Sequence, residues 1–247
     1  MIKRWVILSI LLCVSFVALW ASRGNFYVVV VGVSDYQSIP SLLLPERDAQ
    51  MIAALYKKQT NNVILLTDKY ANKRRILQSL KQQFSRAKEE DMVVLAFSGH
   101  GYPGGICPYD MTKNIDSGIS YEDIQAILKQ TKAKKKMVWA DACFSGGLRI
   151  KGHADSYPDG NVDIVFFLSS RTNETSIENP FMTNGLFTTY LVRGLRGGAD
   201  ANQDRKITAK ELFEFVHKRV VDKSDGKQHP VIWGNFADDY VVMDWSR

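Results

Sequence analysis

Residues Met92–Gly101 read MVVLAFSGHG, so an apolar run ends abruptly in Ser-Gly-His-Gly. Residues Met137–Gly147 follow the same plan, with the apolar run MVWA followed by DACFSGG. Such continuous runs are typical of parallel strands buried on both faces of a sheet. Each predicted strand therefore carries one reactive side chain, His100 or Cys143, in a turn of small residues just beyond its carboxyl end.

Strands and helices alternate along the rest of the chain. This alternation predicts an α/β fold with a mostly parallel sheet covered on both faces, whose functional groups lie beyond the carboxyl ends of the strands. The predicted strands are Phe26–Val33, Val63–Leu66, Met92–Phe97, Met137–Ala140, Asp163–Leu168 and one within Val231–Met243. The predicted helices are Asp48–Lys58, Lys73–Lys88, Ser120–Lys129, Gly185–Leu195 and Thr208–Val221, the last with a capping box between Thr208 and Glu211.

The composition is that of a globular protein. With 45% hydrophobic and 23% charged residues in 247, the chain is neither disordered nor collagenous, and three cysteines are too few for a disulfide scaffold. The net charge of +6 gives no reason to expect a nucleic-acid partner. We interpret the basic run Lys132–Lys136 as a solvated helix end, with a lipid or nucleic-acid patch as the alternative.

Residues 1–24 have the pattern of a signal peptide or a signal anchor, and residues 25–247 form the folded domain. Lys3 and Arg4 precede an apolar run from Trp5 to Ala21. About 17 residues is the short limit for crossing a bilayer, so cleavage and retention as an anchor both stay open. We therefore expect an exported protein, periplasmic or extracellular, or attached to the membrane through this segment.

A thiol and an imidazole at two strand ends are the parts of a nucleophile and its general base. The imidazole of His100 would lower the pKa of the Cys143 thiol and pass its proton to the leaving amine. The alternative is that both residues are structural. Their equivalent places after two buried strands favour the catalytic interpretation.

The blocks SGHG at 98–101 and DACFSG at 141–146, with His and Cys 43 positions apart, resemble those of the caspase-like cysteine peptidases, in particular the metacaspase, paracaspase and bacterial branches. Further similar blocks are GVSDY at 32–36, PYD at 108–110 and QHP at 228–230, so the resemblance covers residues 26–243. It implies a three-layer α/β/α sandwich around a mostly parallel six-stranded sheet. Phe144 departs from the histidine usual in metacaspases, at a position that is not the base.

The resemblance also implies roles for individual residues. Cys143 matches the nucleophile and His100 the general base, while the backbone N–H groups of Gly101 and Cys143 would form the oxyanion hole. Three acids, Asp48, Asp141 and Glu178, match a pocket that receives Arg or Lys before the scissile bond. The alternatives are a helix-start acid for Asp48, a buried structural carboxylate for Asp141 and a solvated loop for Glu178.

The expected activity is therefore that of a cysteine endopeptidase that acts on proteins or peptides with basic residues. The expected site of self-cleavage is the polar segment 149–160. Two alternatives remain: a catalytically latent caspase-fold binding module and a calcium-responsive module. For Cys107, the alternatives are a small buried apolar residue and a reversible disulfide with Cys143.

The calcium-responsive alternative depends on a loop with the order of EF-hand ligands. The side chains are Asp200, Asn202, Asp204, Thr208 and Glu211, and Lys206 contributes its backbone carbonyl. Arg205 stands where the sharp turn calls for glycine. The other interpretation is a turn before a capped helix with no ion, so we expect no required cofactor and name Ca²⁺ as the ion that the pattern suggests.

Overall fold

The computed structural model describes residues 24–142, 163–169 and 183–246. Outside these ranges lie the expected targeting segment up to residue 23, Cys143, Glu178 and the expected self-cleavage segment 149–160. Within them, no helix combines the length and the apolar character needed to cross a membrane.

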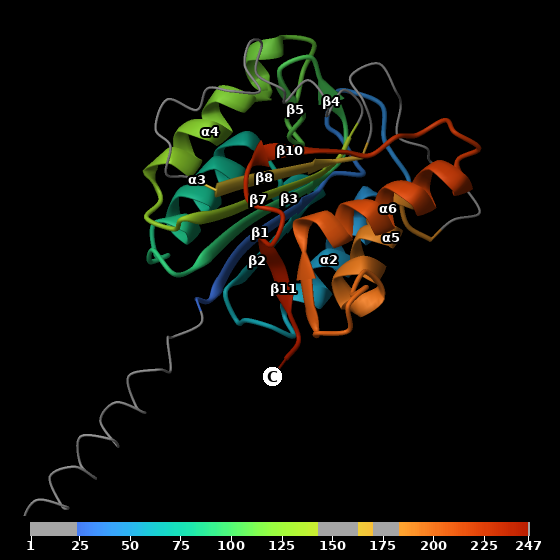
Figure 1. Ribbon diagram of the computed structural model, residues 1–247. Coiled ribbons are helices and arrows are strands. Elements are labelled where there is room, and N and C mark those ends of the chain that lie inside the picture. The colour runs from blue at the N-terminus through green and yellow to red at the C-terminus, as the bar shows by residue number, and fades with distance from the viewer. Residues whose placement is uncertain (1–23, 143–162, 170–182, 247) are drawn as a thin grey trace, which may run out of the picture.

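A six-stranded sheet forms the centre of the molecule, in the order β10-β8-β7-β3-β1-β2 (Figure 1). All its pairs are parallel except the one between β10 and β8. This confirms the mostly parallel six-stranded sheet. Its strands are β1 (Phe26–Gly32), β2 (Val63–Thr67), β3 (Met92–Ser98), β7 (Lys135–Asp141), β8 (Asp163–Leu168) and β10 (Val231–Asn235).

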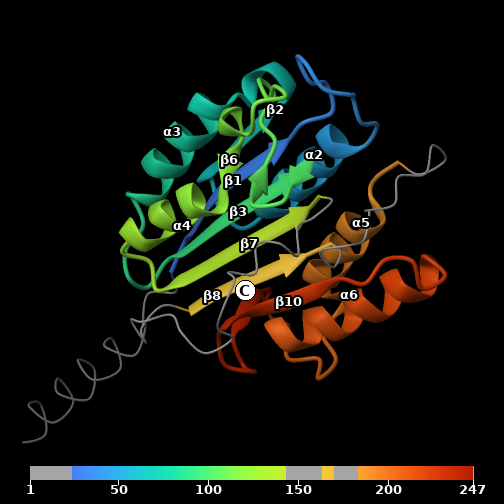
Figure 2. The same ribbon diagram turned by 90° about the horizontal axis from the view of Figure 1, so that it is seen from above.

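Helices cover both faces of the sheet, which confirms the three layers (Figure 2). Helices α2 (Pro45–Tyr56), α5 (Leu186–Arg193) and α6 (Ala209–Lys223) lie on one face, and α3 (Lys73–Phe84) and α4 (Tyr121–Gln130) on the other. Because strand side chains alternate, Val28 and Val30 of β1 join the first core and Val29 and Val31 the second. The predicted capping box between Thr208 and Glu211 opens α6.

Short elements at the edges were not predicted. Strands β4 (Gly101–Tyr102), β5 (Gly105–Ile106) and β6 (Ile119–Ser120) form a small sheet after His100, and β9 (Lys206–Thr208) pairs with β11 (Val241–Asp244). The strand predicted within 231–243 is β10, and β11, which belongs to another sheet, begins in the same segment at Val241. Single turns occur at Asp68–Tyr70 and Ile115–Ser117, and a wider turn at Gly194–Gly198 extends α5. Elements of two or three residues are too short to show a hydrophobic period.

The basic run 132–136 is not a solvated helix end. Helix α4 ends at Gln130, and pairing with β3 begins at Lys135, opposite Met92. Lys136 is only 1% exposed, and this burial lowers the pKa of its ammonium group. Strand β7 therefore begins at Lys135, two residues before the apolar run that starts at Met137.

Candidate active site

Three strands end level at one edge of the sheet. Gly32 of β1 pairs with Ser98 of β3, and Ser98 pairs with Asp141 of β7. The loops that carry His100 and residue 143 therefore leave the sheet from adjacent positions, as the sequence predicts. We call this edge of the sheet, marked by Gly32, Ser98 and Asp141, the catalytic edge.

His100 is held by both its ring and its backbone. Its Nε2 lies 2.9 Å from the carbonyl oxygen of Pro40, and its backbone N–H donates to the Tyr36 hydroxyl at 2.7 Å. Since a carbonyl only accepts, Nε2 carries the hydrogen and the basic nitrogen is Nδ1. The Tyr36 ring lies 5.0 Å from the imidazole ring, and a Cβ at Gly99 would come within 2.6 Å of the Tyr36 hydroxyl. The role of the Pro40 carbonyl could not be predicted from the sequence, because every residue type has a backbone carbonyl.

The amide of Gly101 points away from the hairpin formed by β4 and β5. The N–H of Cys107 donates to the carbonyl of His100, so Gly101 and Ile106 make a non-hydrogen-bonded pair. In such a pair the two amides are directed outward from the ladder. The Gly101 amide can therefore donate to a developing oxyanion beside His100.

Two carboxylates, those of Asp48 and Asp141, lie at the catalytic edge. Asp48, on the first turn of α2, is only 2% exposed and accepts hydrogen bonds from Asn184 Nδ2 at 3.0 Å, Gly185 N at 2.8 Å and Ser98 Oγ at 3.1 Å. Asp141, the last residue of β7, accepts from the backbone and hydroxyl of Thr188 at 3.3 and 2.9 Å. The start of α5 thus holds both acids.

Glycines allow this close packing. A Cβ at Gly185 would lie 2.7 Å from one oxygen of Asp141 and 2.8 Å from one oxygen of Asp48, so both carboxylates converge on the same point. A Cβ at Gly32 would lie 2.6 Å from the Ala49 methyl group, so this glycine lets the start of α2 approach the end of β1. The structure brings Asp48 and Asp141 together as predicted, while Glu178 lies outside the described residues.

A buried hydrogen-bond chain fixes the backbone just before residue 143. The N–H of Ala142 donates to the Ser169 hydroxyl at 3.2 Å, and Gln228 Nε2 donates to the Ser169 carbonyl at 2.9 Å. Ser224, at the end of α6, accepts from the backbone of Gln228 at 3.0 Å. Ser169 and Gln228 were not predicted as functional residues, although the QHP block contains Gln228. The hydrogen-bond chain links the end of β7 to the carboxyl end of α6.

A sequence model of the caspase domain matches residues 26–241, most of the chain. The chain belongs to the caspase domain family. Members of this family are cysteine peptidases, which places the protein among hydrolases at the level of the family. A comparison with curated proteins finds no match.

Two solved structures illustrate the fold shared by this caspase domain. One is the protein GSU0716 from Geobacter sulfurreducens, with 16% identity and a TM-score of 0.63 over 85% of this chain and 92% of that one. The other is pro-sf-caspase-1, with 16% identity and a TM-score of 0.63 over 89% and 94% of the two chains. At this identity the likeness concerns the fold alone.

The acid pair of this caspase domain is electrostatically strained. Burial first, and then the nearby charge of Asp141, raises the pKa of Asp48 to about 7, although the three hydrogen bonds to Asp48 favour its charged form. At neutral pH Asp48 is therefore only partly ionised, and a cation beside it would favour its charged form.

The substitution Asp48→Asn is expected to raise the free energy of unfolding above pH 7. Between the ordinary pKa of about 4 and the folded value of about 7, the folded state binds the extra proton, so wild-type stability falls as pH rises through this window. An amide in place of the carboxylate carries no charge, and its Nδ2 can donate to Ser98. Urea unfolding from pH 4 to 8.5 should show a gap on the order of 2–4 kcal/mol that opens with pH. If the free energies of unfolding of the two proteins change in parallel with pH, the raised pKa of Asp48 is contradicted.

The substitution Gly185→Ala is expected to disturb the acid pair. The backbone of residue 185 (φ −55°, ψ 145°) suits alanine, so the cost comes from the collision of its methyl group with the two carboxylates. We expect a loss of about 1–3 kcal/mol in stability and a higher KM for basic substrates. Urea unfolding and KM measurements check this, and wild-type values of both would show that the acids do not close around this position.

The EF-hand-like loop lies at the other end of α6 from the catalytic edge. Asp200 accepts from the N–H groups of Asp204 and Arg205, and Glu211 accepts from both the N–H and the hydroxyl of Thr208. Asn202 and Lys206 bond within the same turn, to Asp204. In the described part of the chain, no three His, Cys, Asp or Glu side chains are grouped to hold a metal ion. Calcium binding stays a prediction.

Cys107 is a buried residue of the second core, only 4% exposed. Desolvation raises the pKa of its thiol to about 12, which keeps it protonated and unreactive. This agrees with the interpretation as a small buried apolar residue. The disulfide with Cys143 stays a prediction, because Cys143 is outside the described residues.

Proposed function

We propose that this caspase domain is an endopeptidase that cleaves after Arg or Lys with a Cys143–His100 dyad. The observation that carries the proposal is the convergence of Asp48 and Asp141 beside Gly185. The Asp48 carboxylate is bonded only to neutral donors, so its charge is not compensated by a cation of the described chain. A guanidinium or an ammonium group of the substrate supplies that compensation.

In the proposed reaction, Nδ1 of His100 takes the thiol proton and the Cys143 sulfur attacks the scissile carbonyl carbon. The resulting oxyanion is stabilised by the backbone amides of Gly101 and Cys143. His100 then gives its proton to the leaving amine, and the C–N bond breaks to leave a thioester. A water molecule, deprotonated by His100, hydrolyses the thioester and restores the thiol.

The Pro40 carbonyl supports this role of His100, since it holds the Nε2–H and keeps the lone pair on Nδ1. It also accepts the charge-assisted hydrogen bond of the imidazolium ion formed during the reaction. The acid pair favours the metacaspase and paracaspase branches, because the resemblance of this chain to those branches implies basic substrates.

The test is a panel of fluorogenic peptides that differ only in having Arg, Lys or Asp before the bond, hydrolysed by wild type and by Cys143→Ala. We expect wild type to hydrolyse the Arg and Lys peptides and Cys143→Ala none. A preference for Asp would overturn the assigned specificity. Equal rates for the two proteins would overturn the role of Cys143, and no hydrolysis by wild type would favour the latent binding module.

A further inference from the structure

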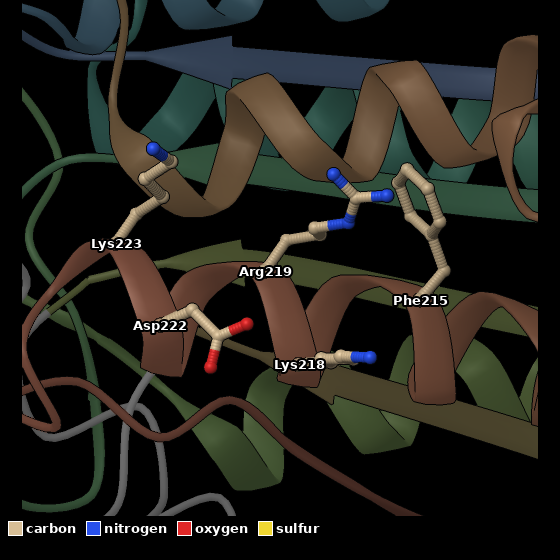
Figure 3. Close-up of a pocket in the computed structure, with 5 residues that line it drawn as sticks. All are labelled: Phe215, Lys218, Arg219, Asp222 and Lys223. Atoms are coloured by element: carbon tan, nitrogen blue, oxygen red, sulfur yellow. The ribbon is translucent and has the colours of Figure 1, made fainter.

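A basic groove runs along α6. Its volume is about 500 Å³, and Phe215, Lys218, Arg219, Asp222 and Lys223 line it. Figure 3 shows the Phe215 ring, the Arg219 guanidinium and the Lys223 ammonium projecting from the same side of α6 toward the neighbouring helix. The four charged side chains are exposed and Phe215 is half-buried. The groove therefore combines one half-buried aromatic ring, at its Phe215 end, with charged groups open to solvent.

The groove is positive and its cations are not neutralised. It carries three basic residues and one acid, and no ion pair joins Lys218, Arg219 or Lys223 to another described residue. The Arg219 guanidinium lies 5.3 Å from the centre of the Phe215 ring. Stacking of this kind orients the guanidinium plane and leaves its N–H groups available to a carboxylate.

A second stacked pair on α5 lies next to Phe215, one of the residues that line the groove. The Tyr190 ring packs against Phe215 edge to face, with 6.5 Å between centres, and the Arg193 guanidinium lies 5.4 Å from the centre of the Tyr190 ring. Two guanidinium groups are thus positioned by two touching rings. Such fixed forks lose less conformational entropy than free side chains when they bind carboxylates.

The Lys223 end of the groove faces the catalytic edge. Helices α5 and α6 lie side by side in both views, and Lys223 is the last residue of α6 (Figures 1 and 2). Next comes Ser224, the first residue of the hydrogen-bond chain that reaches Ala142 through Gln228 and Ser169. A polypeptide that leaves the active site on this side meets Lys223 first and Phe215 last.

The length of the groove sets the length of its ligand. From Phe215 to Lys223, α6 rises about 12 Å, at 1.5 Å per residue. An extended peptide covers the same distance with about four residues, at roughly 3.3 Å each. In an extended peptide of four residues, two side chains point the same way, so two acidic residues can face the cations of the groove.

We propose that this groove is a second substrate-binding site, which takes an acidic stretch of about four residues lying apart from the scissile bond. The inference rests on the proposed function, because it takes the acidic stretch to be part of the substrate that the peptidase cleaves. A concave site with an aromatic ring at its Phe215 end suits a peptide better than a flat membrane surface. Asp222 among the cations also opposes a uniformly negative ligand such as lipid or nucleic acid.

The test measures binding without catalysis. Full-length Cys143→Ala protein is titrated against a fluorescein-labelled peptide that has four consecutive glutamates and no Arg or Lys, and anisotropy gives the Kd. Adding Lys218→Glu and Arg219→Glu is expected to weaken binding at least tenfold, an effect on the order expected for two charge reversals at a complementary site. The matched control is Lys129→Glu with Lys132→Glu, two exposed cations near the end of α4, which should keep the Kd within about twofold.

Cleavage kinetics then separate this proposal from the proposed function. With wild-type Cys143 restored, Lys218→Glu/Arg219→Glu should raise the KM for an Arg substrate with a distal acidic stretch and leave kcat unchanged. A substrate without that stretch should show no change in either constant. Peptide binding without Arg or Lys cleavage would uphold the groove and reject the assigned specificity.

The proposal is overturned if the two charge-reversal pairs weaken peptide binding equally, because that pattern means attraction to the net charge alone. It is also overturned if the glutamate peptide fails to bind while phosphatidylserine vesicles bind and lose affinity in Lys218→Glu/Arg219→Glu. Urea unfolding of each variant confirms that the charge changes leave the fold intact.

Discussion

His100→Ala is expected to lower kcat/KM for an Arg peptide by about 10²- to 10⁴-fold, the range typical of a positioned general base. The change removes the base that deprotonates Cys143 and the acid that protonates the leaving amine. It leaves the backbone bonds of residue 100 to Tyr36 and Cys107 in place, so the fold should persist. Steady-state kinetics with an Arg peptide, together with circular dichroism, provide the measurement.

The matched comparison is Cys143→Ala, which should have no hydrolysis above background. The pH dependence adds a readout that misfolding would not imitate, because the residual rate of His100→Ala should rise with pH as the free thiol ionises, near its ordinary pKa of about 8.5. Near-wild-type turnover by either variant, with contamination excluded, would reject the dyad.

Asp141→Asn is expected to reduce cleavage after Arg or Lys by about 10- to 150-fold, the equivalent of one lost charge-assisted partner at 1.5–3 kcal/mol. The amide keeps the size of the side chain, and its oxygen still accepts from Thr188, so the start of α5 stays in place. What disappears is one of the two charges that face the substrate cation. Because that interaction persists from binding to bond cleavage, the loss should appear mainly in KM.

The control for Asp141→Asn is Glu122→Gln, an exposed acid on α4, which should leave both constants unchanged. The double variant Asp48→Asn/Asp141→Asn should lose the preference for Arg over a neutral residue altogether. Retention of that preference would mean that the specificity comes from groups other than this pair.

The sheet could be predicted from the sequence because strands that are buried on both faces appear as continuous apolar runs. Runs such as 92–97 and 164–168 have no polar residue to alternate, and their order along the chain, with helices between them, implies parallel pairing. The placement of His100 and Asp141 followed from strand ends that meet at one edge, whereas the role of Asp48 beside Asp141 was implied by the family resemblance.

Other parts of the site could not be predicted, because tertiary contacts decide them. The Pro40 carbonyl has no residue-type signal, and Asn184, Gly185 and Thr188 reach the acids from a segment more than 40 positions after Asp141. The basic run 132–136 was misjudged for a related reason: pairing between neighbouring strands outweighed the local preference of lysines for solvent.

The way the acid pair is assembled also determines when the protein can become active during its synthesis. A chain synthesised only as far as residue 180 already contains His100 and Cys143, but it lacks Asn184, Gly185 and Thr188, which hold the two carboxylates. On the ribosome, the reactive pair therefore precedes the part that would hold a basic side chain. Biosynthesis alone would then delay proteolysis until α5 has emerged and packed against α2, and an unfinished chain would pose little danger to its neighbours.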